Sequence, residues 1–150
     1  MNKIAVFTQG AVKFPYKDVP KTYITSVVRK TLKQLTLDNV SVSIIVSDNE
    51  FIKKINADYR KKDYPTDVIS FAYREQPFPE IKEENEVLGD IYISAEKAKE
   101  QAEEIGHSLS DEFARLLVHG ILHLIGYDHE KGKKEEKRMQ EMEDYILERI

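Results

Sequence analysis

The sequence predicts an α+β fold in which a mixed sheet of about four strands is covered by about five helices. Short stretches rich in β-branched residues alternate with longer stretches whose apolar residues recur at helical spacing. The first of these units runs strand, helix, strand, which predicts a crossover with parallel pairing. No repeat, linker or low-complexity stretch interrupts the 150 residues, so we expect a single domain over residues 1–150.

The N-terminal third supplies the first two strands. Isoleucine, valine and phenylalanine predict a strand over residues 3–8. A helix follows, capped by Asp18 and with Pro20 in its first turn. Alternating β-branched residues predict the second strand over 40–46, and a second helix is expected from about 48 to 59.

The middle of the chain supplies the other two strands. We expect one at 68–73 and one at 88–93, the latter antiparallel to one neighbour. Gly89 inside the last strand predicts a bulge or a close approach of another backbone. Residues 74–86 contain two prolines and five glutamates, which predict an exposed, mobile loop. A third helix is expected between Ser94, as its cap, and Gly106.

Two helices complete the chain. An apolar stripe predicts a helix over about 109–126, with Ser110 as its N-cap. A charged amphipathic helix is expected over 133–148, with its methionines and isoleucine against the body of the protein.

Three of the four histidines lie in an eleven-residue window written H-x-x-x-H-x-x-G-x-x-H: His119, His123 and His129. The first two share one face of the predicted helix, and Gly126 lets the chain turn so that the third can return to them. This spacing predicts a metal site at the helix end, with one zinc ion as the default and other divalent transition metals possible. Three histidine ligands leave the fourth position open, as in catalytic rather than structural zinc sites.

The same spacing matches the metzincin signature H-E-x-x-H-x-x-G-x-x-H at every position but one. Gly120 stands where those proteases have the glutamate that serves as general base, so ordinary peptidase chemistry is disfavoured. The sequence identifies no other general base. Asp67, Asp90 and Asp128 could orient a histidine ring, or simply make turn and strand-end hydrogen bonds.

Composition restricts the partners and the location. Residues 21–62 carry nine lysines or arginines and four acidic residues, whereas residues 63–150 carry eleven basic and twenty-two acidic residues. The basic stretch can be a face for a polyanion or merely solvated helix surface. The chain has no cysteine, which excludes disulfides and thiol catalysis, and no apolar run of membrane length, so we expect a cytoplasmic protein that does not bind membranes.

Four blocks of sequence resemble the YbeY endoribonucleases, bacterial zinc proteins of ribosomal RNA maturation. The blocks are Asn56-Ala-Asp-Tyr-Arg60, Pro65-Thr-Asp-Val-Ile-Ser-Phe71, Leu88-Gly-Asp-Ile91 and His119-Gly-Ile-Leu-His-Leu-Ile-Gly-Tyr-Asp-His129. The resemblance implies a hydrolase that cuts single-stranded RNA in 16S rRNA 3′-end maturation and ribosome quality control. It also implies zinc held by the three histidines, a functional arginine at Arg60, and the small ribosomal subunit as partner.

Two other functions remain open on the residues alone. The chain could be an RNA- or ribosome-binding module whose metal is structural, or a metal hydrolase of another substrate. Arg60 could equally be a cation that stabilises the C-terminus of its helix. The oligomeric state is not predicted.

Overall fold

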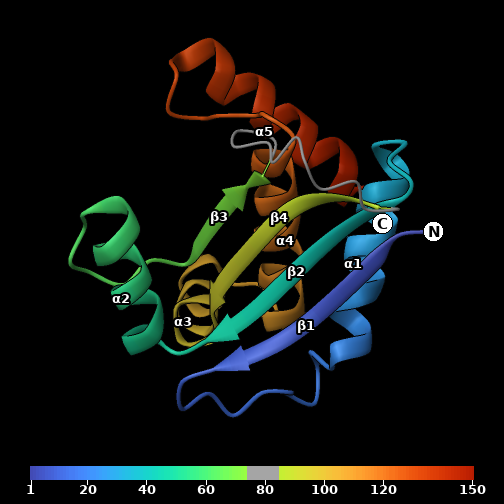
Figure 1. Cartoon of the computed structure of the whole chain (residues 1–150). Coiled ribbons are helices and arrows are strands. Elements are labelled where there is room, and N and C mark those ends of the chain that lie inside the picture. Colours follow the sequence, from blue (N-terminus) through green and yellow to red (C-terminus); the bar gives the residue numbers. More distant parts are fainter. Residues whose placement is uncertain (74–84) are drawn as a thin grey trace.

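The computed structural model describes residues 1–73 and 85–150, and its strands form a four-stranded mixed sheet in the order β1-β2-β4-β3 (Figure 1). β1 (Lys3–Gln9) and β2 (Val40–Ser47) are parallel, as are β2 and β4 (Glu86–Ser94), whereas β3 (Val68–Ala72) runs antiparallel to β4 at the edge. The predicted mixed sheet and the parallel first crossover are therefore confirmed. The loop expected at 74–86 lies, up to residue 84, outside the described residues.

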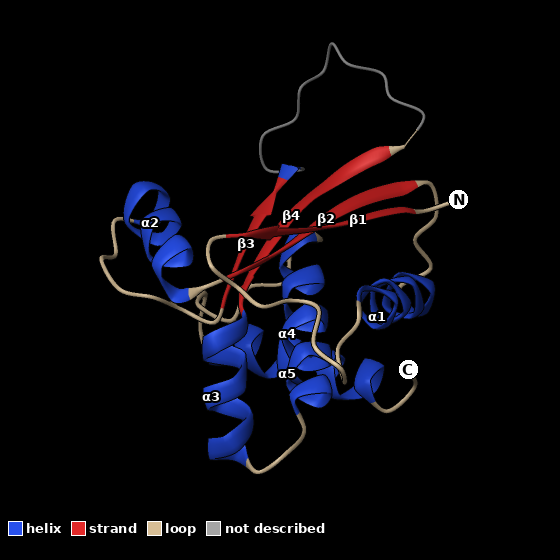
Figure 2. Cartoon of the chain, turned by 90° about the horizontal axis from the view of Figure 1, so that it is seen from below, coloured by secondary structure: helices blue, strands red, loops and turns tan. Residues whose placement is uncertain are grey.

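Five helices occur in the described part of the chain: α1 (Lys21–Gln34), α2 (Asn49–Arg60), α3 (Ala95–Ile105), α4 (Leu109–Leu124) and α5 (Lys133–Leu147). Figure 2 shows α1, α3, α4 and α5 together on one side of the sheet, with α2 apart from them. Fully buried Phe113, Leu117 and Ile121 place α4 in the main core, between the sheet and the other helices. α5 packs on α4 through a second apolar cluster: Val118, Leu122, Met139 and Ile146. None of the helices in the described ranges is both long and apolar enough to cross a membrane.

Two predicted helix caps are wrong. Ser108, not Ser110, caps α4, and its Oγ accepts a hydrogen bond from the Asp111 N–H at 3.0 Å. Both serines precede acidic residues, so the sequence pattern alone does not separate them. α1 begins after the extended Pro20 without a side-chain cap, because a turn closed by the Val19 N–H and the Tyr16 carbonyl occupies the residues around Asp18.

Asp48 fixes the start of α2. Its Oδ1 accepts the Phe51 N–H at 2.8 Å, as an N-cap does, and its Oδ2 accepts the Ala11 N–H at 2.8 Å. These two backbone donors stabilise the carboxylate and hold the pKa of Asp48 below its ordinary value. A single side chain thus joins the loop after β1 to the helix that follows β2.

Two glycines allow α4 to lie close to the sheet at β3 and β4. A Cβ on Gly89 would lie 1.9 Å from the carbonyl oxygen of Phe71, and the β2–β4 register shifts beside it, so the predicted bulge and close approach are confirmed. A Cβ on Gly120 would lie 2.9 Å from Cγ2 of Ile91 and 3.2 Å from Oγ of Ser70. The position that is a glutamate in metzincins therefore has no room for a side chain here. His119 and His123, which precede and follow Gly120 on α4, lie beside the edge strand β3.

Candidate metal centre

His119, His123 and His129 converge at the C-terminal end of α4. Their ring centroids lie 4.8 to 5.2 Å apart, and one ring nitrogen from each falls within 4.8 Å of the others. α4 supplies the first two rings, and the turn at Gly126, with φ of +107°, directs the chain so that the third returns. Three imidazoles at this separation fit a site for one transition-metal ion.

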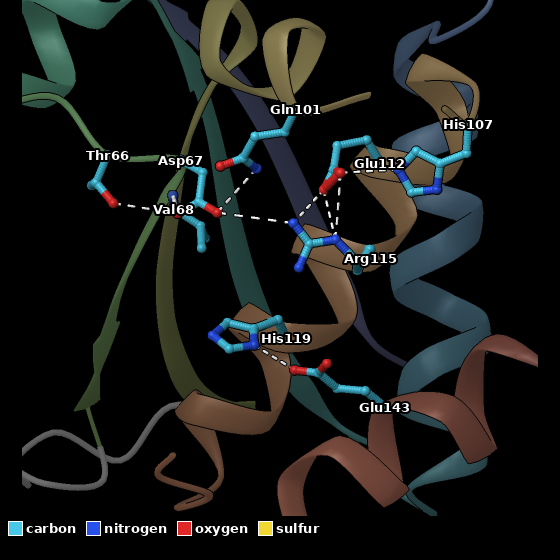
Figure 3. A network of polar contacts seen from close by, with 9 residues as sticks. All are labelled: Thr66, Asp67, Val68, Gln101, His107, Glu112, Arg115, His119 and Glu143. Atoms are coloured by element: carbon cyan, nitrogen blue, oxygen red, sulfur yellow. Dashed lines mark hydrogen bonds and ion pairs between the residues drawn. The ribbon is translucent and has the colours of Figure 1, made fainter. Parts of the chain in front are cut away.

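Glu143 holds one of these rings in place. Its carboxylate contacts Nδ1 of His119 from α5, and its side chain is only 6% exposed (Figure 3). A carboxylate on Nδ1 stabilises the tautomer with the proton on that nitrogen, so Nε2 keeps its lone pair for a metal. Glu143 lies between Met139 and Ile146 on the buried stripe of α5. Sequence reasoning missed this residue, although a carboxylate within an apolar stripe was a visible indication.

The surroundings of His123 favour the neutral form of its imidazole. Burial, reinforced by the neighbouring His119 and His129, lowers the pKa of His123 to about 4. Its imidazole is therefore neutral near pH 7, which is the form that binds metal ions. Its Nε2 lies 3.1 Å from Nδ1 of His129, so these two ring nitrogens are close enough to bind the same ion.

The three rings open onto a cavity of about 540 Å³ beside the edge strand β3. Another part of the wall comes from the C-terminal end of α2 and the residues after it, where Arg60 and Lys62 line the cavity. Arg60 and the three histidines therefore line the same cavity. Its guanidinium lies 3.7 Å from Glu130, an exposed pair that contributes little to stability.

The end of α2 is held by buried Asn56. Its backbone carbonyl accepts hydrogen bonds from the N–H groups of Lys61 and Lys62, and its side-chain Nδ2 donates to the Tyr64 carbonyl at 2.8 Å. Lys61 takes the left-handed conformation, φ +58°, which ends the helix and turns the chain. These contacts fix the backbone on both sides of Arg60 at the rim of the cavity.

A second arginine, Arg115, lies one turn before His119 and is already engaged. Its Nε donates to Glu112 at 2.6 Å, and Glu112 is fully buried and also bonded to His107 (Figure 3). Asp67 lies 4.0 Å from the same guanidinium. Arg115 therefore lines the cavity with its positive charge largely compensated by Glu112 and Asp67. Arg60 is more available than Arg115 to bind an anion.

The aspartates considered as partners of a histidine make other bonds. Asp67 accepts the Val68 N–H at 2.8 Å and a Gln101 amide at 3.2 Å, which fixes the start of β3. Asp90 accepts the Tyr73 hydroxyl at 2.9 Å, and Asp128 accepts the Glu130 N–H at 2.8 Å in the turn. Asp67 and Asp128 thus make the strand-end and turn bonds of the second alternative, whereas Asp90 bonds a tyrosine side chain from the middle of β4.

Ser70 leaves one buried polar atom without a partner in the β3 wall. The residue lines the cavity, but its Oγ is buried, has no hydrogen-bond partner within the described ranges, and faces α4, where a Cβ on Gly120 would lie 3.2 Å from it. The accessible part of the site therefore combines a place for a cation with a nearby arginine for an anion.

Comparison with known proteins identifies relatives over nearly the whole chain. The family model described as Endoribonuclease YbeY matches residues 8–150. A protein of Aquifex aeolicus named Endoribonuclease YbeY is 46% identical over 139 residues, covering 93% of this chain and 89% of its own length. One of the same name from Bacillus licheniformis is 53% identical over 116 residues, covering 75% of this chain and 73% of its own.

A solved structure supports the same relationship. The solution structure of TM1509 from Thermotoga maritima superposes with a TM-score of 0.62 at 28% sequence identity, covering 97% of this chain and 87% of that one. The similarity in fold therefore extends over nearly the whole chain.

Proposed function

Because this chain belongs to the YbeY endoribonuclease family, we propose that it is a metal-dependent endoribonuclease that cuts single-stranded RNA. The observation that supports this most directly is the cluster of His119, His123 and His129 at an open cavity that Arg60 also lines. A structural metal would be enclosed by four protein ligands, whereas three histidines facing a cavity leave one position for a reactant.

The histidines are the proposed metal ligands, with zinc as the default ion. The three imidazoles, the depressed pKa of His123 and the carboxylate behind His119 all suit a borderline-soft divalent cation. When bound, such an ion supplies positive charge that can polarise a phosphoryl oxygen and acidify water.

Arg60 is the proposed anchor for the phosphate. Its guanidinium can bind two phosphate oxygens at once and stabilise negative charge that develops during cleavage. To do so it leaves Glu130, at little cost because that ion pair is exposed.

The proposed biological setting is the maturation of the 3′ end of 16S rRNA and ribosome quality control, on the small ribosomal subunit in the cytoplasm. Exposed Lys61 and Lys62 lie beside the cavity and favour a polyanionic substrate. This placement is supported by family membership together with that local charge.

The test compares wild type with His123→Ala on a single-stranded RNA, the matching duplex and casein. We expect wild type to cut the single strand in a zinc-dependent way and the variant to lose both zinc and cleavage while keeping its circular dichroism spectrum. If the variant cuts as fast as wild type, a contaminating nuclease explains the activity and the proposal fails. Tight RNA binding without cleavage would favour a binding module, and casein hydrolysis would favour another hydrolase.

A further inference from the structure

Four aromatic rings form a continuous group on the face of the sheet opposite α4: Phe51, Tyr59, Phe71 and Tyr92. Ile91 and Ser70 face Gly120 of α4, so the next residues along their strands, Tyr92 and Phe71, point to the other face. The Phe71 and Tyr92 ring centroids are 5.7 Å apart, and α2 adds Phe51, stacked 6.3 Å from Tyr92.

Tyr59 is the outermost member of this group. Its ring meets Phe71 edge-on, with centroids 5.3 Å apart and planes at 72°. Yet 68% of Tyr59 is exposed, more than any other aromatic residue in the described part of the chain. A tyrosine that served only to pack would bury its ring, whereas this contact fixes the ring and leaves most of it in solvent.

Two neighbours of this ring line the metal cavity. Phe71, which it contacts, lines that cavity, and so does Arg60, the next residue in the chain. Lys61 and Lys62 follow and are exposed. An aromatic face beside several cations is the combination that single-stranded nucleic acids require, because the bases stack while the backbone is held by charge.

We infer that Tyr59 stacks on the base next to the phosphate held in the cavity, and that this contact selects unpaired RNA. The inference rests on the proposed endoribonuclease function. A base inside an A-form duplex is already covered on both faces by its neighbours, so only an unpaired base can reach the ring. Stacking does not depend on base identity, so the site discriminates strandedness rather than sequence.

The chain contains no tryptophan, so Tyr59→Trp introduces a single indole at the rim. Fluorescence is read on rapid mixing of the zinc-loaded variant with a short single-stranded RNA, before cleavage. We expect the RNA to quench the indole, and we expect little quenching by the same sugar–phosphate backbone without bases or by duplex RNA. Tyr145→Trp is the matched control, because Tyr145 is also exposed but lies on α5 beneath Arg149, and its indole should not respond.

Kinetics supply the second readout. Tyr59→Ala should raise KM for single-stranded RNA about 5- to 100-fold, with a smaller change in kcat and an unchanged melting temperature. It should also reduce the preference for the single strand over the duplex. Tyr59→Phe keeps the ring and should restore KM.

Equal quenching by base-containing and abasic strands, or no quenching by either, overturns the stacking contact, as does a wild-type KM in Tyr59→Ala. If wild type cuts RNA but the fluorescence of the Tyr59→Trp indole does not change, only the stacking inference is wrong and the proposed function stands. If wild type does not cut RNA, the proposed function is wrong, and the stacking inference is still decided by the quenching.

Discussion

Replacing Glu143 by glutamine should weaken zinc binding without unfolding the protein. Glutamine keeps the size of the side chain and can still accept a hydrogen bond from Nδ1 of His119, but it lacks the charge that makes the opposite nitrogen a better ligand. The carboxylate is 6% exposed, so water does not replace it. Loss of such a partner weakens metal binding about 10- to 100-fold, which corresponds to about 1.4–2.7 kcal/mol.

The assay is competition for zinc against a chelating indicator at pH 7, together with thermal unfolding at a fixed free zinc concentration. A tenfold loss of affinity should reduce the stabilisation by zinc by about 1.4 kcal/mol at high free zinc. Glu141→Gln is the matched control on the same helix, because Glu141 is 68% exposed and pairs only loosely with Lys137. The reasoning is refuted if Glu143→Gln folds and binds zinc as tightly as wild type, or if the control loses as much.

Gly89→Ala should lower the free energy of unfolding by roughly 2–4 kcal/mol, because φ is +149° and the new Cβ meets the Phe71 carbonyl at 1.9 Å; an unchanged urea midpoint would contradict this. Asp48→Ala should cost about 1 kcal/mol at pH 7. Because folding depresses the pKa of Asp48, its contribution is present above the unfolded pKa and is lost as pH falls through the folded value. The difference between wild type and variant should therefore begin to shrink only below about pH 4 and should go on shrinking as the pH falls further; a constant difference down to pH 2 would exclude the linkage. Arg60→Glu should lower kcat for single-stranded RNA by at least about 100-fold with zinc affinity intact, and a parallel loss of zinc would assign Arg60 a structural role.

Local pattern was sufficient to predict most of the fold. Strands and helices occur where periodicity places them, and the capping residues Ser94 and Gly106 of α3 were identified correctly. Their bonds are made within a few residues, so the sequence specifies them directly. The errors at Asp18 and Ser110 concern helix starts, where a turn or a second serine competes for the same position.

The metal centre was predictable where it depends on one helix and the turn after it. His119, His123 and His129 converge because helical spacing and Gly126 require it. Glu143 could not be deduced in the same way, since its contact with His119 spans 24 residues and depends on how α5 packs on α4. The fixed position of the exposed Tyr59 ring could not be deduced from the sequence either, because its contact with Phe71 depends on how α2 packs against β3.

The most direct test of the proposed metal centre is an anomalous-scattering map, recorded at the zinc edge, from crystals grown with zinc. We expect one strong peak within bonding distance of His119, His123 and His129, with the remaining coordination position of the ion open to the cavity lined by Arg60. A map without a peak among these rings, or with the ion closed off by a fourth protein side chain, would contradict it.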